Sequence, residues 1–403
     1  MSELVIVGAG HGAGQVVASL LQKKFEGRVT IVGEEKWYPY QRPPLSKKFL
    51  SGALPAERLY FKPESFYDTP SVDVVLDTRV TAIDRDACTV STASGSSYAY
   101  DRLVLATGSR PRLLAVPGAE LKGIHYLRGI DDVTGIRAEM AAGKRMAIVG
   151  AGYIGLEVAA VAATAGLDVT VIEMADRVMS RVVSPELSDY YQDVHGRNGV
   201  ALRLSTGVVG FTGDERVAAV QLDDGGEIDA DIVVIGIGIV PNVELAADCG
   251  LQVGDGIVVD DHCRTSDPCI YAIGDCTWHP NSILGINLRL ESVHNALEQA
   301  KTAAANICGD EMTYAQVPWF WSDQYDLKLQ IAGLSQGYDQ VVMRGDPASN
   351  AFACLYLRGG ALIAIDAVNS PKDFVQSKAL IAAHAVIDPA VLADTTIELK
   401  NMN

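Results

Sequence analysis

The sequence predicts an α/β fold with two parallel-sheet domains of one type and a third, C-terminal α+β domain. Two observations support this prediction. A strand, glycine turn, helix and second strand follow one another twice, from residue 4 and again from residue 146. From Met312 onward the chain changes to aromatic and strand-rich segments. A repeated pattern of this kind indicates two copies of one supersecondary unit.

The second copy of the pattern is the more complete. The apolar run 146–149 leads into a glycine-rich turn that opens an Ala-rich helix. This is the Rossmann dinucleotide fingerprint with its flanking elements. The first glycine allows the tight turn, the second lets the backbone approach a pyrophosphate, and the third lets helix and strand pack closely. The candidate dinucleotide-binding residues here are Gly150, Gly152, Tyr153, Ile154 and Gly155.

An acidic residue, Glu173, ends the second strand of this copy. Its carboxylate can accept hydrogen bonds from both hydroxyls of an adenosine ribose, and it would repel a 2′-phosphate. The next residue is Met174 rather than an arginine. We therefore expect NADH rather than NADPH at this domain.

The first copy begins at strand 4–7, continues as a helix to Phe25, and ends after strand 29–32. Its third fingerprint position is alanine rather than glycine, which the pattern allows. His11, inside the turn, is expected to be a solvent-side loop residue rather than a catalytic one. Two copies imply two bound dinucleotides. The candidate contacts of the first copy are Gly8, Gly10, Gly12 and Ala13, with Glu34 as the ribose carboxylate and Glu35 as the alternative.

Two similar turns predict where the chain leaves the first domain and returns to it. Ala106, Thr107 and Gly108 follow strand 98–105, and the segment 236–242 mirrors them after strand 232–235. The domain boundaries expected from these turns are 1–109 and 238–313 for the first nucleotide domain, 110–237 for the second, and 314–403 for the C-terminal domain.

Three further segments complete the expected first domain. Residues 72–80 and 88–92 read as short strands. Residues 265–275 read as a strand that ends in Asp275, a suitable acceptor for a ribityl hydroxyl of a flavin. The helix 291–308 has apolar residues on one face, and its N-terminus is a candidate dipole for an anionic ring.

Composition and charge exclude several classes of protein. The net charge of −17 argues against broad nucleic-acid or anionic-membrane binding. The seven cysteines are odd in number and scattered without a C-x-x-C, so neither a disulfide framework nor a metal site is expected. No apolar run reaches the roughly 18–20 residues of a membrane span. A strand begins almost at once, so no signal peptide is expected, and we predict a cytoplasmic protein.

Several motifs follow one another along the whole chain. They are the two GxGxx(A/G) turns at 8–13 and 150–155, PPLSK at 43–47, ATG at 106–108, GYIGLE at 152–157, AIGD at 272–275 and PWFWSDQY at 318–325. Together they resemble one protein family, the FAD-dependent NADH:ferredoxin reductases of cytochrome P450 and aromatic-ring dioxygenase systems. Gln41, where an acid often precedes RPPLSK, and Ala13 depart from the family pattern.

The resemblance implies a glutathione-reductase-like plan, with FAD in the first domain and NADH in the second. It implies a [2Fe–2S] ferredoxin as partner, feeding a cytochrome P450 or a ring-hydroxylating dioxygenase, and a monomer or homodimer. Lys47 is implied as the catalytic group near flavin N5, held by Glu157. Further cofactor contacts are implied at Val80, Ala106, Thr107, Gly108, Arg128, Gly238, Asp275, Val293 and Trp319, although Trp319 also suits a core position.

Two other functions stay open at this point. A rubredoxin reductase differs mainly in its electron acceptor. A binding flavoprotein like apoptosis-inducing factor shares the fold, but the charge of −17 disfavours its DNA binding. Disulfide reductases need a cysteine pair after the first nucleotide unit, and there is no cysteine from Glu34 to Cys88.

Overall fold

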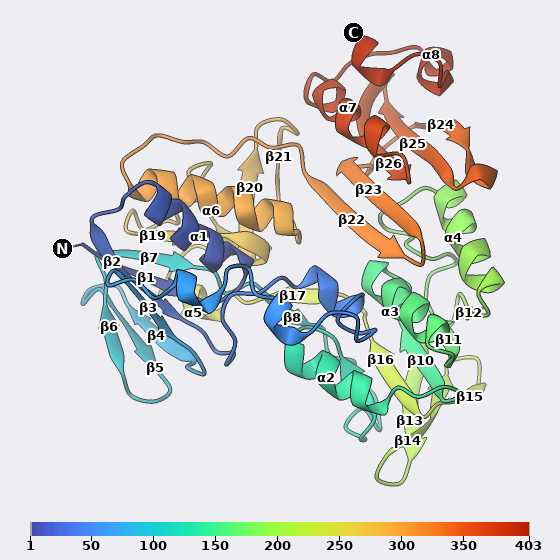
Figure 1. The fold of residues 1–403 in the computed structure, drawn as a ribbon, viewed down its shortest axis with the longest axis horizontal. Helices are drawn as coiled ribbons and strands as arrows, with labels where there is room; N and C mark the ends of the chain where they lie inside the picture. The colour runs from blue at the N-terminus through green and yellow to red at the C-terminus, as the bar shows by residue number, and fades with distance from the viewer. Residues whose placement is uncertain (1, 403) are drawn as a thin grey trace. The chain divides into compact units, whose positions relative to one another are not determined.

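The computed structural model describes residues 2–402 (Figure 1). The chain forms two compact units. The first contains residues 2–42, Glu57–Arg110 and Val240–Pro318, and the second contains Pro43–Ala56, Pro111–Ile239 and residues 319–402. Compactness therefore groups Pro43–Ala56, which carries Lys47, with the second unit. The domain boundaries expected above follow nucleotide binding rather than compactness and stay a prediction.

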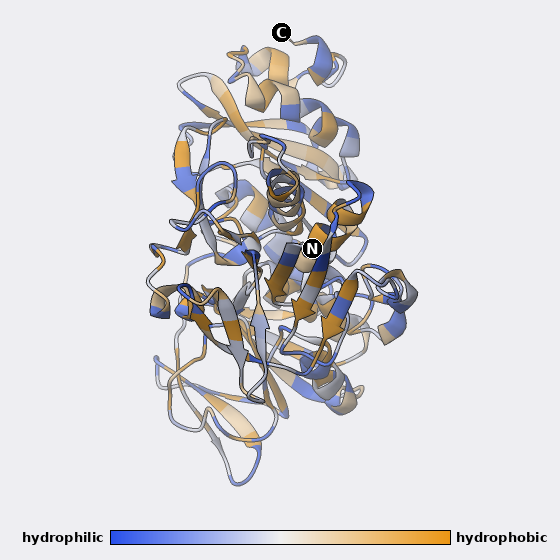
Figure 2. Ribbon diagram, turned by 90° about the vertical axis from the view of Figure 1, so that its left-hand side faces the viewer, coloured by the Kyte–Doolittle hydropathy of each residue, from blue (hydrophilic) through white to orange (hydrophobic). Residues whose placement is uncertain are grey.

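A five-stranded parallel sheet forms the centre of the first unit, in the order β19-β7-β1-β2-β3. Alternate residues of β1 face opposite sides of a strand. Leu4 and Ile6 pack with the core under helices α1 and α6, whereas Val5 and Val7 pack with the core on the other face. The strands beside the N-terminus are accordingly orange over much of their length in Figure 2. The strands are β1 Ser2–Val7, β2 Gly27–Val32, β3 Val72–Val75, β7 Arg102–Leu105 and β19 Ile270–Ala272.

Helices cover one face of this sheet and a small antiparallel sheet covers the other (Figure 1). Helix α1 contacts α6, and α5 contacts β4. The helices are α1 His11–Gln22, α5 Glu244–Asp248 and α6 Val293–Ile307, with the 3₁₀ turns η2 Ala56–Arg58, η3 Glu64–Phe66 and η4 Gly274–Cys276. The remaining strands are β4 Val80–Asp84, β5 Thr89–Thr92, β6 Ser97–Ala99, β18 Ile257–Val258, β20 Thr277–Asn281 and β21 Ile286–Leu288.

Four sequence-based expectations for this unit are wrong in detail. The single strand expected over 98–105 is two strands, β6 and β7, which belong to different sheets. The single strand expected over 72–80 is two strands, because Asp77 adopts a left-handed backbone (φ 51°) between β3 and β4. The strand expected over 265–275 is confined to β19, which follows a turn made by Asp267 and Pro268. His11 is the buried first residue of α1 rather than a solvent-side loop residue.

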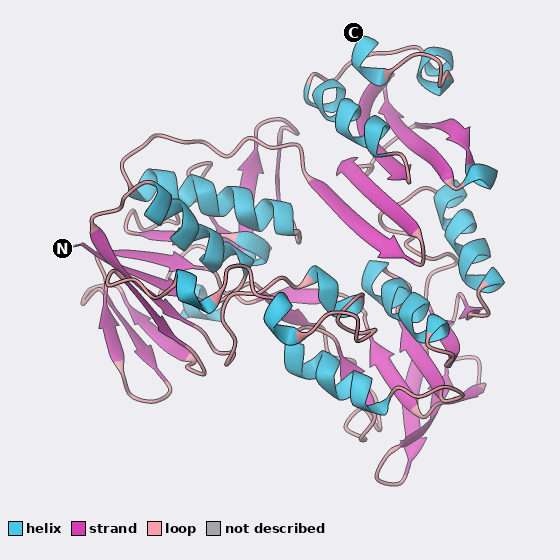
Figure 3. Cartoon of the chain, viewed as in Figure 1, coloured by secondary structure: helices cyan, strands magenta, loops and turns pink. Residues whose placement is uncertain are grey.

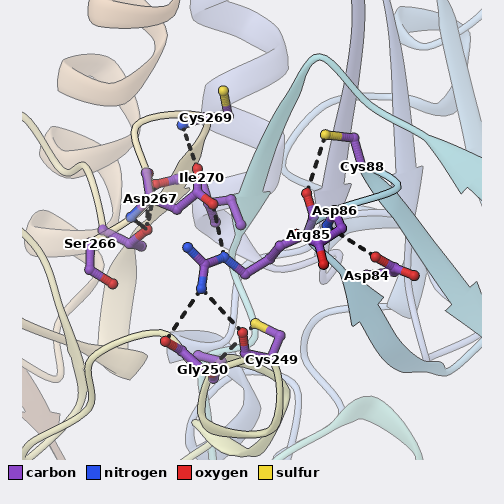
Figure 4. A network of polar contacts seen from close by, with 12 residues as sticks. Asp84, Arg85, Asp86, Cys88, Cys249, Gly250, Ser266, Asp267, Cys269 and Ile270 are labelled. Carbon is purple, nitrogen blue, oxygen red and sulfur yellow. Dashed lines mark hydrogen bonds and ion pairs between the residues drawn. The ribbon is translucent and has the colours of Figure 1, made fainter.

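A polar network around Arg85 fastens three separate segments of this unit (Figure 4). The Arg85 Nε donates to Asp267 at 2.8 Å, and its Nη1 donates to the carbonyl oxygens of Cys249 and Gly250 at 3.4 Å each. Asp267 in turn accepts the Cys269 N–H at 2.9 Å. The network thus joins the turn after β4, the segment after α5 and the turn that precedes β19.

The second unit contains another five-stranded parallel sheet, in the order β12-β11-β10-β16-β9. Helix α3 contacts β10 and β11, and the sheet β13-β14-β15 packs against a core of sheet residues that includes Ala147 and Val233. The helices are α2 Ile130–Glu139, α3 Tyr153–Thr164 and α4 Pro185–Arg197, with the turn η1 Pro43–Ser46. The strands are β9 Ile124–Tyr126, β10 Arg145–Val149, β11 Asp168–Ile172, β12 Ala201–Arg203, β13 Val208–Gly213, β14 Val217–Leu222, β15 Glu227–Asp229 and β16 Ile232–Ile235. Strands β8 Ser109–Pro111 and β17 Ile239–Pro241 pair where the chain passes between units.

The C-terminal part of the second unit is an antiparallel sheet, β22-β23-β26-β25-β24, that contacts helix α7 (Figure 3). Strands β25 and β26 are buried along most of their length. The Tyr190 ring of α4 meets Phe352 of β25 edge-to-face with ring centroids 4.8 Å apart, and α7 contacts β26. The elements are β22 Trp319–Gln324, β23 Leu327–Gly333, β24 Gln340–Asp346, β25 Ala351–Arg358, β26 Ala361–Val368, α7 Pro371–Ala382 and α8 Pro389–Ala393, with the turns η5 Pro347–Ser349 and η6 Leu399–Asn401.

The two parallel sheets and the antiparallel C-terminal sheet confirm the predicted fold class. Among residues 2–402, none of the helices has the length and apolar character needed to cross a membrane. All seven cysteines are free thiols.

A fully buried carboxyl group, Asp366 of β26, makes the stability of the second unit depend on pH. The Tyr356 hydroxyl donates to its Oδ2 at 2.5 Å, and its Oδ1 has no hydrogen-bond partner. Burial raises the pKa of Asp366 to about 7. A carboxyl whose native pKa lies above the unfolded value of about 3.9 loses its stabilising contribution as pH rises from about 4 to 7.

We therefore expect Asp366→Asn to raise the melting temperature by a few degrees at pH 8, and the gain to vanish toward pH 4. The exposed Asp326 provides the control, since Asp326→Asn should change the melting temperature little at either pH. Thermal unfolding from pH 4 to 8 measures both. A gain that is the same at every pH would contradict the assignment.

Candidate functional site

The two glycine turns have nearly the same geometry. Gly8 and Gly150 adopt left-handed backbones, with φ of 106° and 105°. A Cβ on Gly8 would lie 2.2 Å from the Ala106 carbonyl oxygen, and one on Gly150 would lie 2.5 Å from that of Gly236. The backbone conformation and the close approach both require glycine. Each turn is thus pressed against the loop at the end of a neighbouring strand.

The second glycine of each turn has a different role. Gly10 and Gly152 are the N-caps of α1 and α3, with φ of −92° and −78°, which any residue can adopt. A Cβ on either would meet no atom within 4 Å, and no side chain caps either helix. The fold therefore does not need glycine there. Open space in front of free helix N–H groups fits a dinucleotide pyrophosphate, so both turns fit this ligand.

The third fingerprint position differs between the turns for a packing reason. A Cβ on Gly155 would lie 2.1 Å from the Gly150 carbonyl oxygen, so no side chain fits. Ala13 at the corresponding position of α1 is fully buried in the core of the first unit. Between these positions, the Tyr153 ring lies 4.9 Å from the Phe320 ring, and Ile154 is exposed.

Glu173 is held by the backbone of its own turn. Its Oε2 accepts the Ala151 N–H at 2.7 Å and its Oε1 accepts the Ala175 N–H at 2.9 Å. A carboxylate has about four lone-pair positions, so each oxygen can accept a further bond. The carboxylate is therefore oriented beside the pyrophosphate turn with acceptor capacity left for ribose hydroxyls.

The two acids after β2 are in different environments. Glu34 is exposed and lies 3.3 Å from Arg79. Glu35 accepts from Arg42 at 2.5 Å and from the Tyr40 hydroxyl at 2.6 Å. The Glu35 carboxylate is thus held by Arg42 and Tyr40, whereas the Glu34 carboxylate is more accessible to a ligand.

A deeply buried polar contact of the site is made by Glu157 on α3, which is 3% exposed. The Lys47 Nζ lies 2.7 Å from its Oε2, and the Ser46 hydroxyl donates to the same oxygen. The Ser322 hydroxyl donates to Oε1 at 2.6 Å. Two hydroxyl donors and an ammonium offset the loss of water around a buried carboxylate. Lys47 also contacts the carbonyl of Pro43 at 3.2 Å.

Sequence reasoning paired Lys47 with Glu157 from the family resemblance but did not identify Ser46 and Ser322. Both serines lie inside quoted motifs, PPLSK and PWFWSDQY. Membership of these motifs was the only sequence feature that marked the two serines. It could not show that both hydroxyls bind the Glu157 carboxylate.

In the first unit, Asp275 lies in the glycine turn after β19. The Ser109 hydroxyl donates to it at 2.9 Å. The preceding residue, Gly274, has a left-handed backbone (φ 82°) and donates its N–H to the buried Gln299 of α6 at 2.7 Å. Sequence reasoning missed Gln299, which had no motif to mark it. This side chain fixes the turn that presents Asp275.

Helix α6 begins at Val293. Ser292 is its N-cap and accepts the Asn295 N–H at 3.1 Å. The first-turn amides of a helix have no intrahelical acceptor, and the N-terminus carries partial positive charge. The start of α6 is therefore suited to a ligand atom that bears negative charge.

The remaining candidates are dispersed. Val80 is buried at the start of β4, the Thr107 hydroxyl donates to the Asn242 carbonyl at 2.7 Å, and the Arg128 N–H donates to Asp132 at 2.9 Å. Trp319 is half-buried, with its ring 5.4 Å from that of Trp321. In the first unit lie Gly8, Gly10, Gly12, Ala13, Glu34, Glu35, Val80, Ala106, Thr107, Gly108, Asp275 and Val293; in the second lie Lys47, Arg128, Gly150, Gly152, Tyr153, Ile154, Gly155, Glu157, Glu173, Gly238 and Trp319.

Two family models match the chain. The model described as pyridine nucleotide-disulphide oxidoreductase matches residues 2–300, and the model described as reductase C-terminal matches residues 319–403. Rhodocoxin reductase of Rhodococcus erythropolis is 44% identical over 398 residues, which cover 98% of this chain and 93% of that protein.

The segments 318–325 and 369–371 lead us to expect a close likeness to putidaredoxin reductase. That enzyme of Pseudomonas putida is 42% identical over 405 residues, covering 99% of this chain and 96% of the relative. The solved covalent putidaredoxin reductase–putidaredoxin complex matches with a TM-score of 0.96 at 42% identity, over 99% of this chain and 97% of that chain.

The open space at Gly152 predicts a variant that folds but binds dinucleotide weakly. We expect Gly152→Ala to change the free energy of unfolding by about 1 kcal/mol or less, because its φ suits alanine and no atom is displaced. We expect its affinity for NADH to fall about tenfold or more, because the methyl group occupies the approach of the pyrophosphate. Titration with NADH and thermal unfolding measure the two effects.

Gly150→Ala is the matched control. It should destabilise the fold by more than about 1 kcal/mol, because φ is positive and the carbonyl of Gly236 is in the way. Wild-type NADH affinity in Gly152→Ala would show that no pyrophosphate lies against this turn.

Proposed function

The chain belongs to the pyridine nucleotide-disulphide oxidoreductase family, and on this premise we propose that it is an FAD-containing, NADH-dependent ferredoxin reductase. The observation that carries the proposal is that the segment after the first nucleotide unit has a lysine paired with a glutamate and lacks a cysteine pair. No cysteine occurs from Glu34 to Cys88, where disulfide reductases need a pair. The same segment instead contributes Lys47, paired with the buried Glu157.

FAD is proposed to bind the first unit. Gly10 and the N-terminus of α1 would hold its pyrophosphate, and Glu34 would accept from its adenosine ribose. Asp275 would accept from a ribityl hydroxyl, and the N-terminus of α6 would stabilise negative charge on the flavin ring. The other proposed contacts in the first unit are Gly8, Gly12, Ala13, Glu35, Val80, Ala106, Thr107, Gly108 and Val293. The family resemblance adds Arg128 and Trp319, which belong to the second unit. When bound, FAD would accept two electrons as a hydride and release them one at a time.

Lys47 is proposed to supply positive charge near flavin N5, with Glu157 holding its ammonium in place. A fixed positive charge in a site with little water stabilises the negative charge that develops on the flavin when N5 accepts a hydride. The Ser46 and Ser322 hydroxyls keep the carboxylate satisfied, so the pair does not need water. The residues thus position charge, and neither is assigned proton transfer.

NADH is proposed as the electron donor at the second glycine turn. Gly150, Gly152 and Gly155 would hold its pyrophosphate with Tyr153, Ile154 and Gly238 beside it, and Glu173 would accept from its ribose. The proposed electron acceptor is a [2Fe–2S] ferredoxin that serves a cytochrome P450 or a ring-hydroxylating dioxygenase. The proposal is supported by relatives named as ferredoxin reductases, one of them a component of a dioxygenase system, and by the solved complex with putidaredoxin. A cytoplasmic location is proposed because all seven cysteines are free thiols.

NADH-dependent reduction of cytochrome c, with and without an added [2Fe–2S] ferredoxin, tests the proposal. We expect strong dependence on the ferredoxin. Flavin reduction by NADH with acceleration by a rubredoxin alone would identify a rubredoxin reductase instead. Firm retention on heparin resin at low salt, together with no ferredoxin dependence, would favour a nucleic-acid-binding flavoprotein.

The role of Lys47 predicts that Lys47→Ala lowers FAD retention or slows NADH-driven flavin reduction by about tenfold or more. Stopped-flow absorbance and the flavin-to-protein ratio measure these effects. The adjacent Lys48 is exposed, and Lys48→Ala should leave both quantities unchanged. Unchanged flavin content and reduction rate in Lys47→Ala would rule out the assigned role.

The role of Glu173 predicts a change of coenzyme preference. We expect Glu173→Ala combined with Met174→Arg to shift the kcat/KM ratio of NADPH to NADH upward by about tenfold or more, since repulsion of the 2′-phosphate is replaced by attraction. Met174 is 80% exposed, so Met174→Arg alone is a tolerated control. An unchanged coenzyme ratio in the double variant would count against Glu173 as the ribose ligand.

A further inference from the structure

We infer that Ser322, Gln324 and His195 are positioning residues for the Lys47–Glu157 pair, joined to it by a hydrogen-bond chain in which every donor is directed toward the Glu157 carboxylate. This inference rests on the proposed function of Lys47. The chain is made by three elements of the second unit that are far apart in sequence: α3, β22 and α4.

The contacts run without a gap from the carboxylate to a tyrosine. The Ser322 hydroxyl donates to Glu157 Oε1 at 2.6 Å, and Gln324 Nε2 donates to the Ser322 Oγ at 3.2 Å. Gln324 Oε1 lies 2.9 Å from His195 Nε2. The Tyr325 hydroxyl lies 3.2 Å from His195 Nδ1.

The directions of these bonds follow from one another. The hydroxyl proton of Ser322 is used on Glu157, so its oxygen accepts from the amide nitrogen of Gln324. The amide oxygen of Gln324 then faces His195, whose Nε2 must carry the proton. Burial lowers the pKa of His195, which makes the ring neutral at pH 7, so Nδ1 accepts from the Tyr325 hydroxyl. One histidine tautomer is thereby selected.

The central residues of the hydrogen-bond chain are shielded from water. Ser322 and His195 are fully buried, and Gln324 is 1% exposed. Ser322 and Gln324 are two residues apart on β22, so their side chains share one face of the strand. In such surroundings successive hydrogen bonds polarise one another, and their aligned dipoles add at the carboxylate.

The Gln324 amide in the middle of the hydrogen-bond chain determines whether the chain can transfer a proton. A carboxamide does not pass a proton from its nitrogen to its oxygen as a hydroxyl or an imidazole can, so Gln324 interrupts proton transfer between His195 and Ser322. The chain therefore stabilises the negative charge and orientation of Glu157. Through that charge it holds the Lys47 ammonium.

The test compares two replacements of the histidine in the holoenzyme. His195→Phe keeps a ring without a donor, and His195→Gln places an N–H at a similar reach. We expect His195→Phe to lower the flavin reduction potential and to slow NADH-driven reduction about threefold to tenfold. We expect His195→Gln to restore both. Gln324→Met, which removes the amide at similar volume, should reproduce the His195→Phe result even if that variant folds poorly.

Two further measurements separate positioning from a merely structural role. Imidazole ¹⁵N NMR, with the His195 signals identified by their loss in His195→Gln, should show the Nε2–H tautomer. In a Lys47→Ala background, His195→Phe should have little additional effect on the reduction rate, because the two residues act through one ion pair.

An Nδ1–H tautomer, an unchanged flavin potential in both His195→Phe and Gln324→Met, or fully additive effects with Lys47→Ala would overturn the inference. A normal reduction rate in Lys47→Ala would instead show that the proposed function of Lys47 is wrong, and the inference would fall with it.

Discussion

The buried carboxylate of Glu157 is the constraint on which much of the second unit depends. An acid at 3% exposure in the first turns of a helix must be paired, or the helix could not pack where it does. Its partners come from η1 and the residue after it, and from β22. Satisfying one charge therefore fixes the segment Pro43–Ala56 and the first C-terminal strand against α3.

This arrangement gives the C-terminal domain a part in the site. The motif PWFWSDQY alternates along β22, so Ser322 and Gln324 face the interior, whereas Trp319 and Trp321 are half-buried. The interior side carries the hydrogen-bond chain to Glu157 and His195. Tyr190 and Ser184 near α4 make further contacts to the same domain, at Phe352 and Tyr356. The parallel sheet and the antiparallel sheet of the second unit are thus joined by polar contacts as well as apolar ones.

The two glycine turns show how one local solution is used twice with different packing. Gly8 and Gly150 are required by backbone conformation and by a facing carbonyl oxygen. Gly10 and Gly152 are required by neither, so their lack of a side chain has a functional explanation. The third position is glycine at Gly155, because a Cβ there would lie 2.1 Å from the Gly150 carbonyl oxygen, and alanine at Ala13, where the core around α1 holds the methyl group.

The sequence alone was sufficient for the fold class, the two glycine turns and the elements around them, because glycine, apolar run and helix are neighbours in the chain and their pattern is local. The sequence predicted the strands within 72–80 and 265–275 less accurately, because the left-handed Asp77 and the turn at Asp267 and Pro268 interrupt these segments. Only the tertiary structure decided that Ser46 and Ser322 meet Glu157, that Gln299 fixes the Asp275 turn, and that His195 is buried against Gln324. These partners are separated by 25 to 165 residues. No periodicity records such a meeting, because it depends on how whole elements pack and on the need of each buried polar atom for a partner.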